Sequence, residues 1–394
     1  MDLSPATVPP LDDRSLSGWQ VARRFFPHLL ALLFPLNALL FSLSGPHGAA
    51  TGLLFIIPIA VALRLDRRSP PELRQPNRHM PAWPFNMLLA VLVVLQVANV
   101  VLLARLFSQQ SLWSLDTLIG IVVVGSSSGY SGIVVAHELI HRPQSWVRQF
   151  GRLLLATVLY EHFYTEHVRG HHVRVGTAED PATARFGESF GAFYVRTVPA
   201  QFRSAYRLEK QRVGRDLPFY HPRTLKNRVI QGVIFEWTAA IALWLWLGPA
   251  AFIMHLLQAA WATRALEVVN YFEHWGIERT TRRVLPQHSW DTDSRFTYFA
   301  LTGLSRHADH HAFASRPYQQ LRSWPSSPRL PRGYLAMFPL VLVRNARYRQ
   351  LMSAELERCG MRRGQDRAPA ELAPTSARQP STMQITPSGS GISK

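Results

Sequence analysis

The stretch His167-Val168-Arg169-Gly170-His171-His172 decides how this chain is interpreted, because it places three imidazoles within six residues. Three further histidine groups lie elsewhere in the chain. They are His137 with His141, His274, and His307 with His310 and His311. Nine of the sixteen histidines therefore fall in four short segments. Such clustering is typical of a metal site, since imidazole is the commonest metal ligand among side chains.

The composition indicates a membrane protein. The 394 residues carry 43 Lys and Arg against 25 Asp and Glu, and the apolar residues gather into long runs. The basic residues flank those runs and form no single patch, which favours membrane topology and argues against a nucleic-acid partner. The single cysteine, Cys359, excludes a disulfide framework and a fused iron–sulfur module. Electrons for a redox reaction would therefore come from another protein.

Six transmembrane helices are expected, because a helix needs ~20 apolar residues to cross the hydrocarbon core. The apolar runs lie at residues 25–43, 49–63, 83–107, 115–136, 229–247 and 250–269. The second is the shortest and contains Pro58, so a tilted helix or a partial re-entrant segment stays open. The N-terminus lacks the features of a removed signal peptide, so the first run should be retained. The fold class is all-α integral membrane.

The connections between the runs predict the orientation. Every connection rich in Lys and Arg falls on one side of a six-span bundle, and the opposite turns are short and almost uncharged. The positive-inside rule then places both termini and the long loops in the cytoplasm of a bacterial-type inner membrane. All nine clustered histidines reach that same face. We therefore expect a cytoplasmic, histidine-rich cap on the helix bundle.

Four regions follow from this topology. Residues 1–22 should form a flexible cytoplasmic N-terminus and residues 23–322 a membrane-embedded catalytic domain. Residues 323–361 should form a cytoplasmic C-terminal segment. Residues 362–394 are rich in Pro, Ser, Thr and Gly and should form a disordered tail.

The spacing of the histidines predicts two metals. On a helix, residues four apart share a face, so His137 with His141, and His167 with His171, should each face one metal. Neighbouring rings such as His171 and His172 diverge and suit two metals side by side. The group at 307–311 repeats this geometry. Nine nitrogens exceed the four ligands of a tetrahedral zinc, whereas two ions would each be close to five-coordinate. Imidazole alone does not select iron, zinc, copper or nickel.

Five carboxylates adjoin the histidines and are candidates for roles at the metals. They are Glu138, Glu166, Glu273, Asp180 and Asp309. We expect them to accept hydrogen bonds from ligand ring N–H groups, although any one could instead bridge the metals. His162 has no place in the histidine pattern, and His288 is a candidate for a supporting contact. Arg264 and Glu267, one turn apart in the sixth run, should form a structural ion pair.

The small-residue run Gly125-Ser-Ser-Ser-Gly-Tyr-Ser-Gly132 lies in the fourth expected span. It has two compatible interpretations. Small residues allow close packing of helices in a membrane, and they could also form the wall of a channel that admits a slender chain to the metals.

The four histidine groups resemble those of the integral-membrane alkane hydroxylases, within the fatty acid desaturase and hydroxylase superfamily. The segments that carry the resemblance are His137-Glu-Leu-Ile-His-Arg142, Glu166-His-Val-Arg-Gly-His-His172 with Glu179-Asp-Pro-Ala182, Asn270-Tyr-Phe-Glu-His-Trp-Gly276, and Arg306-His-Ala-Asp-His-His-Ala312 with Arg316-Pro-Tyr318. The resemblance implies two non-haem irons held by the nine histidines, with dioxygen as co-substrate. It further implies electrons from rubredoxin through an NAD(P)H-dependent reductase. Trp275, Ile140 and the acidic segment 288–293 depart from the family pattern and leave the ligands untouched.

Three classes of function are compatible with these observations. The first is a monooxygenase that hydroxylates an unactivated, terminal C–H bond of an alkane, with a lipid, terpenoid or aromatic-methyl desaturase or hydroxylase as the close alternative. The second is a zinc metalloprotease using His137-Glu138-Leu-Ile-His141, with Glu138 as general base; it leaves six histidines unexplained. The third is a transporter with histidine relays, which should lie within the spans. The basic cytoplasmic surface should suit an acidic electron carrier and anionic lipid headgroups.

Overall fold

The structure is a computed structural model that describes residues 8–214, 217–218 and 220–361. The expected tail at 362–394 and the first seven residues of the expected N-terminal segment lie outside the described residues. Within the described part every regular element is a helix, and only isolated β-bridges accompany them. The expected all-α fold is therefore confirmed.

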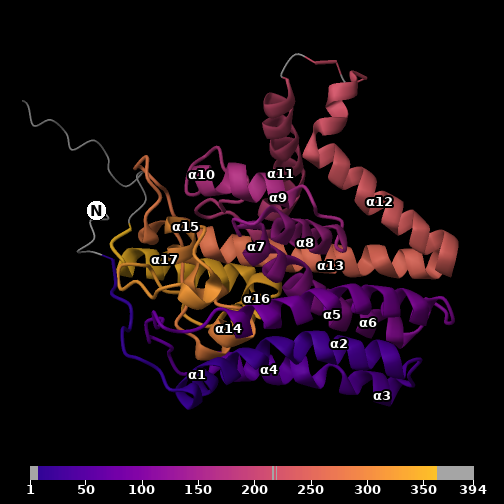
Figure 1. Ribbon diagram of the computed structural model, residues 1–394, viewed down its shortest axis with the longest axis horizontal. Coiled ribbons are helices and arrows are strands. Elements are labelled where there is room, and N and C mark those ends of the chain that lie inside the picture. Colours follow the sequence, from indigo (N-terminus) through magenta and orange to yellow (C-terminus); the bar gives the residue numbers. More distant parts are fainter. Residues whose placement is uncertain (1–7, 215–216, 219, 362–394) are drawn as a thin grey trace, which may run out of the picture. The chain divides into compact units, whose positions relative to one another are not determined.

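The first two apolar runs form a helical hairpin. Its first arm consists of α1 (Gly18–Phe25), the 3₁₀ segment η1 (Phe26–Leu32) and α2 (Leu33–Ser44), and it starts at a capping box in which Ser17 and Gln20 satisfy each other's backbone N–H groups. Its second arm consists of α3 (Ala49–Leu54) and α4 (Ile57–Arg67). The two arms lie alongside each other in Figure 1.

The third and fourth runs form the centre of the bundle. The third is α5 (Trp83–Phe107). The fourth consists of α6 (Leu115–Ser127), the π-helical η2 (Ser128–Val134) and α7 (Val135–Ile140), so its helix continues past the expected end at residue 136. Buried Gln96 of α5 donates to Ser128 Oγ at 3.0 Å and accepts from Ser131 Oγ at 2.8 Å. Polar groups of the small-residue run are thus satisfied between the helices.

A cap of short helices follows the fourth run. It contains α8 (Ser145–Ala156), α9 (Phe163–Thr165), the π-helical η3 (Glu166–His171) and α10 (His172–Arg174). Two long helices come next: α11 (Phe190–Val213) and, after η4 (Pro222–Lys226), α12 (Arg228–Leu247). Gly248, at φ 87°, forms the turn into α13 (Pro249–His274). In Figure 1, α13 runs alongside α5 and α6, and α12 leans away.

The C-terminal part completes the cap with short elements. They are η5 (Pro286–His288), α14 (Arg295–Ala300), η6 (Leu304–Arg306), α15 (His307–Ala312), η7 (Tyr318–Gln320), α16 (Tyr334–Leu342) and α17 (Asn345–Arg358). Met337 of α16 and Tyr348 and Met352 of α17 are fully buried in the same hydrophobic core as residues of α5, α7 and α13. The segment after residue 322 therefore packs directly on the membrane-embedded part.

Five helical segments of the described chain are long and apolar enough to cross a membrane. They are Gly18–Ser44, Ala49–Arg67, Trp83–Phe107, Leu115–Ile140 and Arg228–Leu247. These five coincide with five of the six expected spans. The sixth expected span corresponds to α13, whose polar residues, among them His255, Arg264 and Glu267, make it too polar for this set.

The expected ion pair within α13 is absent from the described residues. Glu267 is fully buried and accepts hydrogen bonds from three neutral groups. They are the Tyr160 hydroxyl (3.0 Å), the Gln201 amide (2.8 Å) and the Asn270 amide (3.1 Å). Arg264 instead lies over the rings of Phe190 and Tyr194. The prediction was wrong because neutral donors from neighbouring elements reach the carboxylate and satisfy it without the guanidinium.

Candidate metal centre

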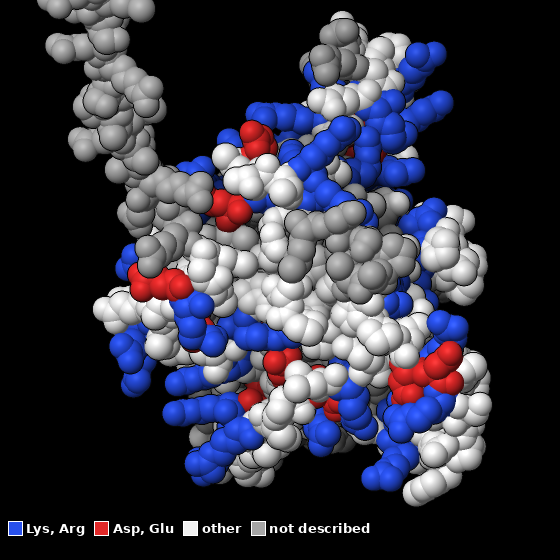
Figure 2. Space-filling model, turned by 90° about the vertical axis from the view of Figure 1, so that its left-hand side faces the viewer, with Lys and Arg blue, Asp and Glu red and all other residues white. Residues whose placement is uncertain are grey.

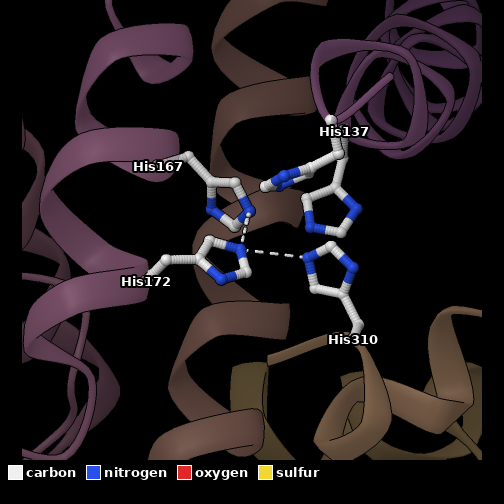
Figure 3. Close-up of side chains that lie close together, drawn as sticks. His137, His167, His172 and His310 are labelled. Atoms are coloured by element: carbon white, nitrogen blue, oxygen red, sulfur yellow. Dashed lines mark hydrogen bonds between the residues drawn. The ribbon is translucent and has the colours of Figure 1, made fainter. Parts of the chain in front are cut away.

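The structure brings all nine clustered histidines together in two groups. The five-histidine group consists of His137, His141, His167, His172 and His310, and the four-histidine group of His171, His274, His307 and His311. Within each group, one ring nitrogen of every member lies within 4.8 Å of those of all the others. Figure 3 shows four rings of the first group pointing toward a common centre from three separate parts of the chain.

Two of the expected spacings hold. His137 and His141 are one helical turn apart around α7 and both face the five-histidine group. The adjacent His171 and His172 diverge, so that each joins a different group. Neighbouring residues on one turn thus place the two groups side by side.

The expected pairing of His167 with His171 is wrong. His167 instead faces the same group as His172, with the two Nε2 atoms 3.0 Å apart. The reason is that η3 is a π-helix, whose wider i→i+5 turn brings residues five apart into register. On α15 the ordinary spacing holds, because His307 and His311 share the four-histidine group while His310 joins the other.

The ring nitrogens of the four-histidine group make more close contacts than their hydrogens and lone pairs can satisfy one to one. The Nε2 of His307 is 3.2 Å from that of His274 and 2.9 Å from that of His311, whose Nε2 is 3.2 Å from that of His171. A neutral imidazole nitrogen carries either one hydrogen or one lone pair, so it cannot donate and accept together. Even with donors and acceptors alternating, a chain of three such contacts makes one N–H group and one lone pair each serve two partners, whereas a cation accepts all four lone pairs.

These spacings also fit an ion with more than four ligands. Two nitrogens ~2.1 Å from one ion are ~3.0 Å apart at a right angle and ~3.4 Å apart at the tetrahedral angle. The closest Nε2 pairs lie at 3.0 Å in the five-histidine group and at 2.9 to 3.2 Å in the other. These closest pairs therefore match the right-angle spacing better than the tetrahedral one.

Burial keeps these rings neutral. The pKa values of His167, His172, His307, His310 and His311 all lie well below that of an ordinary histidine. The main cause is removal from water, and the second is repulsion between neighbouring imidazoles when charged. Neutral rings keep the lone pairs that a metal requires.

Asp180 makes the contact that was expected of it. Its Oδ2 lies 2.9 Å from His171 Nδ1 and accepts a hydrogen bond from Thr183 Oγ1 at 2.6 Å. Burial alone would raise the pKa of Asp180, but contact with His171 and Thr183 leaves it below its usual value. The carboxylate thus holds the proton of His171 on Nδ1 and leaves the Nε2 lone pair directed at the four-histidine group.

Glu273 lies on the inner side of the rings. Its Oε2 is 3.3 Å from His307 Nε2, the same nitrogen that faces His274 and His311. The carboxylate is fully buried and also lines the apolar cavity described below. Glu273 is therefore the one of the five candidate carboxylates placed to contact a metal, and the bridging alternative stays open for it.

The other three carboxylates pair with arginines. Each forms one ion pair at 2.6 Å: Glu138 with Arg142, Glu166 with Arg174, and Asp309 with Arg316. None of the three accepts from a clustered histidine in the part of the chain that is described. Glu138 therefore pairs with Arg142 and belongs to neither histidine group.

Two further histidines lie outside both groups. His162 packs against the rings of Tyr160 and Phe202. His288 accepts the backbone N–H of Leu285 through Nδ1 at 3.0 Å. Neither ring has a ligand position in this arrangement.

An apolar cavity of about 330 Å³ ends at the metal centre. Its walls come from α6, η2, α13 and α16, and its lining includes His137, His167 and His307, so it meets both groups. Val343, 79% exposed, also lines it and shows that it opens at the surface beside α16. Gly129 packs against α13, as the packing interpretation of the small-residue run expects, and it also lines the cavity. That the run admits a slender chain stays a prediction. Sequence reasoning missed α16, whose only signal was the short apolar run from Tyr334 to Leu342.

Comparison with known proteins places this geometry in a family. The family model described as fatty acid desaturase matches residues 111–340. Alkane 1-monooxygenase 1 of Pseudomonas aeruginosa is 36% identical over 71% of this chain and 74% of its own length, and alkane 1-monooxygenase 1 of Alcanivorax borkumensis is 32% identical over 84% and 85%. The chain belongs to the alkane 1-monooxygenase branch of the fatty acid desaturase family.

Membership of this family agrees with the apolar helices, and the protein is an integral membrane protein. A further relative, alkane 1-monooxygenase 2 of Pseudomonas aeruginosa, is 42% identical over 56% of this chain and 60% of its own length. The matched part thus spans less than two thirds of that relative. The family resemblance that the histidine segments predict is confirmed.

Proposed function

We propose that this chain is a membrane diiron monooxygenase that hydroxylates the terminal C–H bond of an alkane or a similar apolar alkyl substrate. The proposal takes the names of its relatives as a guide and depends on one observation of this chain. The apolar cavity ends on histidines of both metal-binding groups. A substrate that enters it would meet both metals with one end.

The nine histidines are proposed as the ligands of two irons, one for each group. Their neutral rings and close Nε2 spacings support this assignment, and family membership favours iron among the metals that imidazole accepts. Glu273 is proposed as an additional carboxylate at the four-histidine group. Bound irons would supply the activation of dioxygen and the oxidising power for an unactivated C–H bond.

The cavity lining determines which part of a substrate reaches the rings. Its walls are mostly apolar and include Leu266, Leu301 and Leu304, which offer no hydrogen bonds. An alkyl chain is therefore held by shape and by exclusion of water, and the end of the chain is the part that fits against the rings. This arrangement supports terminal hydroxylation.

The membrane topology extends this proposal. We propose α13 as a sixth span, since 26 residues give ~39 Å of helix, more than the ~30 Å hydrocarbon core. Its polar residues Gln258 and Glu267 are fully buried against the protein and away from lipid. With six spans, both termini and the metal centre lie on the side of the Lys- and Arg-rich connections, which is the cytoplasm.

The electron donor is proposed to be a rubredoxin-type carrier with its NAD(P)H-dependent reductase. The chain contains one cysteine, Cys359, which is too few for an iron site with four cysteine ligands. The surplus of Lys and Arg over Asp and Glu supports docking of an acidic carrier.

The test is iron quantification on the full chain purified in detergent, coupled to hydroxylation of medium-chain alkanes with a reconstituted electron supply. We expect two irons per chain and a terminal alcohol as product. The variant His141→Ala serves as the metal-deficient control. One zinc per chain with proteolytic activity would contradict the proposal, and a product containing a new double bond or a hydroxylated aromatic methyl group would select the close alternative.

A further inference from the structure

A second cavity, of about 1100 Å³, lies beside the first helical hairpin and has a strongly basic rim. Six arginines line it: Arg14, Arg23, Arg24, Arg68, Arg74 and Arg295. Its floor is apolar and includes Phe26, Leu30, Leu65 and Phe299. The histidine cavity and this basic cavity share no lining residue.

The charge of the rim is only partly compensated. Asp12 pairs with Arg14 at 2.9 Å and with Arg24 at 2.6 Å. Glu72 pairs with Arg74 at 2.6 Å and with Arg295 at 3.2 Å. Arg23 and Arg68 form no ion pair in the described part of the chain, and both are exposed. Six guanidinium groups therefore face two carboxylates, which leaves four positive charges for an anion.

The basic cavity lies where a membrane surface would meet the protein. Part of its lining comes from the start of the segment Gly18–Ser44, and further lining lies at and just beyond the end of the segment Ala49–Arg67. Both segments are long and apolar enough to span. Large apolar side chains are exposed beside it, with Trp19 at 72% and Phe26 at 57%. Exposed aromatic residues at a span end are typical of the headgroup level of a bilayer. Figure 2, which faces this end of the molecule, shows basic side chains covering far more of the surface than acidic ones.

We propose that this cavity binds an anionic phospholipid, with the phosphate between Arg23 and Arg68 and the acyl chains along the hairpin. Guanidinium groups bind phosphate through paired N–H donors, and basic pockets between membrane helices are suited to anionic headgroups. The apolar floor distinguishes a lipid from an acidic protein, because Phe26, Leu30 and Leu65 continue onto the exposed apolar surface of the spans.

The bound lipid would join the hairpin to the segment that carries the last histidines. Phe299 of α14 lines the cavity and packs edge-on against His28 of η1, with ring centroids 4.8 Å apart. Arg306, the residue before α15, donates to the backbone carbonyl of Arg74 at 2.6 Å. Because an occupied cavity holds both elements, lipid binding should stabilise the folded protein.

The experiment uses the full chain in detergent and titrates phosphatidylglycerol, with binding followed by native mass spectrometry and by the midpoint of thermal unfolding. The variant Arg23→Gln/Arg68→Gln removes the two unpaired charges and breaks no ion pair or side-chain hydrogen bond among the described residues. The control Arg105→Gln/Arg207→Gln removes two exposed arginines outside the cavity. Each cavity arginine should contribute about fivefold to the affinity for phosphatidylglycerol. The cavity variant should therefore bind the lipid roughly 25-fold more weakly than the wild-type protein, and the control variant should bind it as tightly as the wild-type protein. Arg23→Lys/Arg68→Lys should retain most of the binding.

Several outcomes would overturn the proposal. Equal losses of lipid affinity in both double variants would show that exposed arginines contribute equally wherever they lie on the surface. Equal affinity for phosphatidylcholine would show that the headgroup charge plays no part. Full competition by soluble glycerol phosphate would indicate a site for a free anion and not for a lipid. If the cavity variant kept its lipid but lost binding of an acidic electron carrier, the cavity would be a protein-docking site.

Discussion

The contact between Asp180 and His171 offers a sharp test of how the metal centre is held. The carboxylate is fully buried, and its Oδ2 lies 2.9 Å from His171 Nδ1. Asp180→Asn keeps the size of the side chain and an oxygen that can accept, but removes the negative charge. We expect the variant to fold and to bind one of the two metals more weakly.

The magnitude follows from the hydrogen bond. A bond to a charged acceptor contributes about 1.5–3 kcal/mol, and a neutral one about 1 kcal/mol. The loss of roughly 1.4 kcal/mol corresponds to about a tenfold decrease in metal affinity, the lower end of the 10- to 100-fold range for partners of metal-ligating histidines. Only the four-histidine group should be affected, because Asp180 contacts no ring of the other group.

The assay is competition between the loaded protein and a graded series of chelators, with iron measured per chain. The wild-type curve and the Asp180→Asn curve should coincide for one iron and separate about tenfold for the other. Asp66→Asn is the matched control, since Asp66 is also buried and accepts from Thr297 at 2.6 Å, and its hydrogen-bond partners in the described part of the chain include no histidine. If Asp66→Asn weakened iron binding equally, or if both irons of Asp180→Asn were lost together, the reasoning would be refuted.

Three further predictions concern the rings and their support. His141→Ala should retain about one iron per chain by elemental analysis and His162→Ala two, because only His141 belongs to a group; equal iron in both would contradict the assignment. Gly151→Ala should lower the thermal midpoint by destabilising the fold ~1–3 kcal/mol, since a Cβ at Gly151 would lie 3.1 Å from the backbone N of Ile140 on α7; an unchanged midpoint would show that α8 can shift freely. Removing iron with a chelator should lower the unfolding temperature of the wild-type protein, because metal binding and folding are linked. An unchanged unfolding temperature would mean that the folded protein binds iron no more tightly than the unfolded chain does.

The sequence predicts which residues form the site better than it predicts how they are arranged. Four histidine segments, five apolar runs and the role of Asp180 could be identified from residue type and spacing. The apolar runs and the histidine segments depend on local periodicity, and the contact of Asp180 joins residues nine apart in the chain. The pairing of His167 with His172 could not be identified, because a change from α- to π-helical turns leaves no reliable trace in residue type.

Contacts between distant segments account for the remaining differences. Glu267 is satisfied by Tyr160 and Gln201, which are 107 and 66 residues away in the chain. The contribution of α16 to the cavity likewise depends on its packing against α13. A helical pattern shows which face of a helix is apolar but not which element covers that face. The spacing of Arg264 and Glu267 along α13 therefore predicts an ion pair, whereas Glu267 is satisfied by residues from other elements.

The three carboxylates that turn away from the rings explain how nine histidines can be held close together. Each histidine segment except the single His274 carries one carboxylate whose arginine lies four to eight residues further along the chain. The pairs are Glu138 with Arg142, Glu166 with Arg174, and Asp309 with Arg316. Buried ion pairs add little net stability but can select one arrangement among several. Because neutral rings with facing lone pairs repel one another, each segment needs a local constraint that does not depend on the metal. The ion pairs supply that constraint, so we infer that the cap orders the rings before metal binds and that the metal then removes their repulsion.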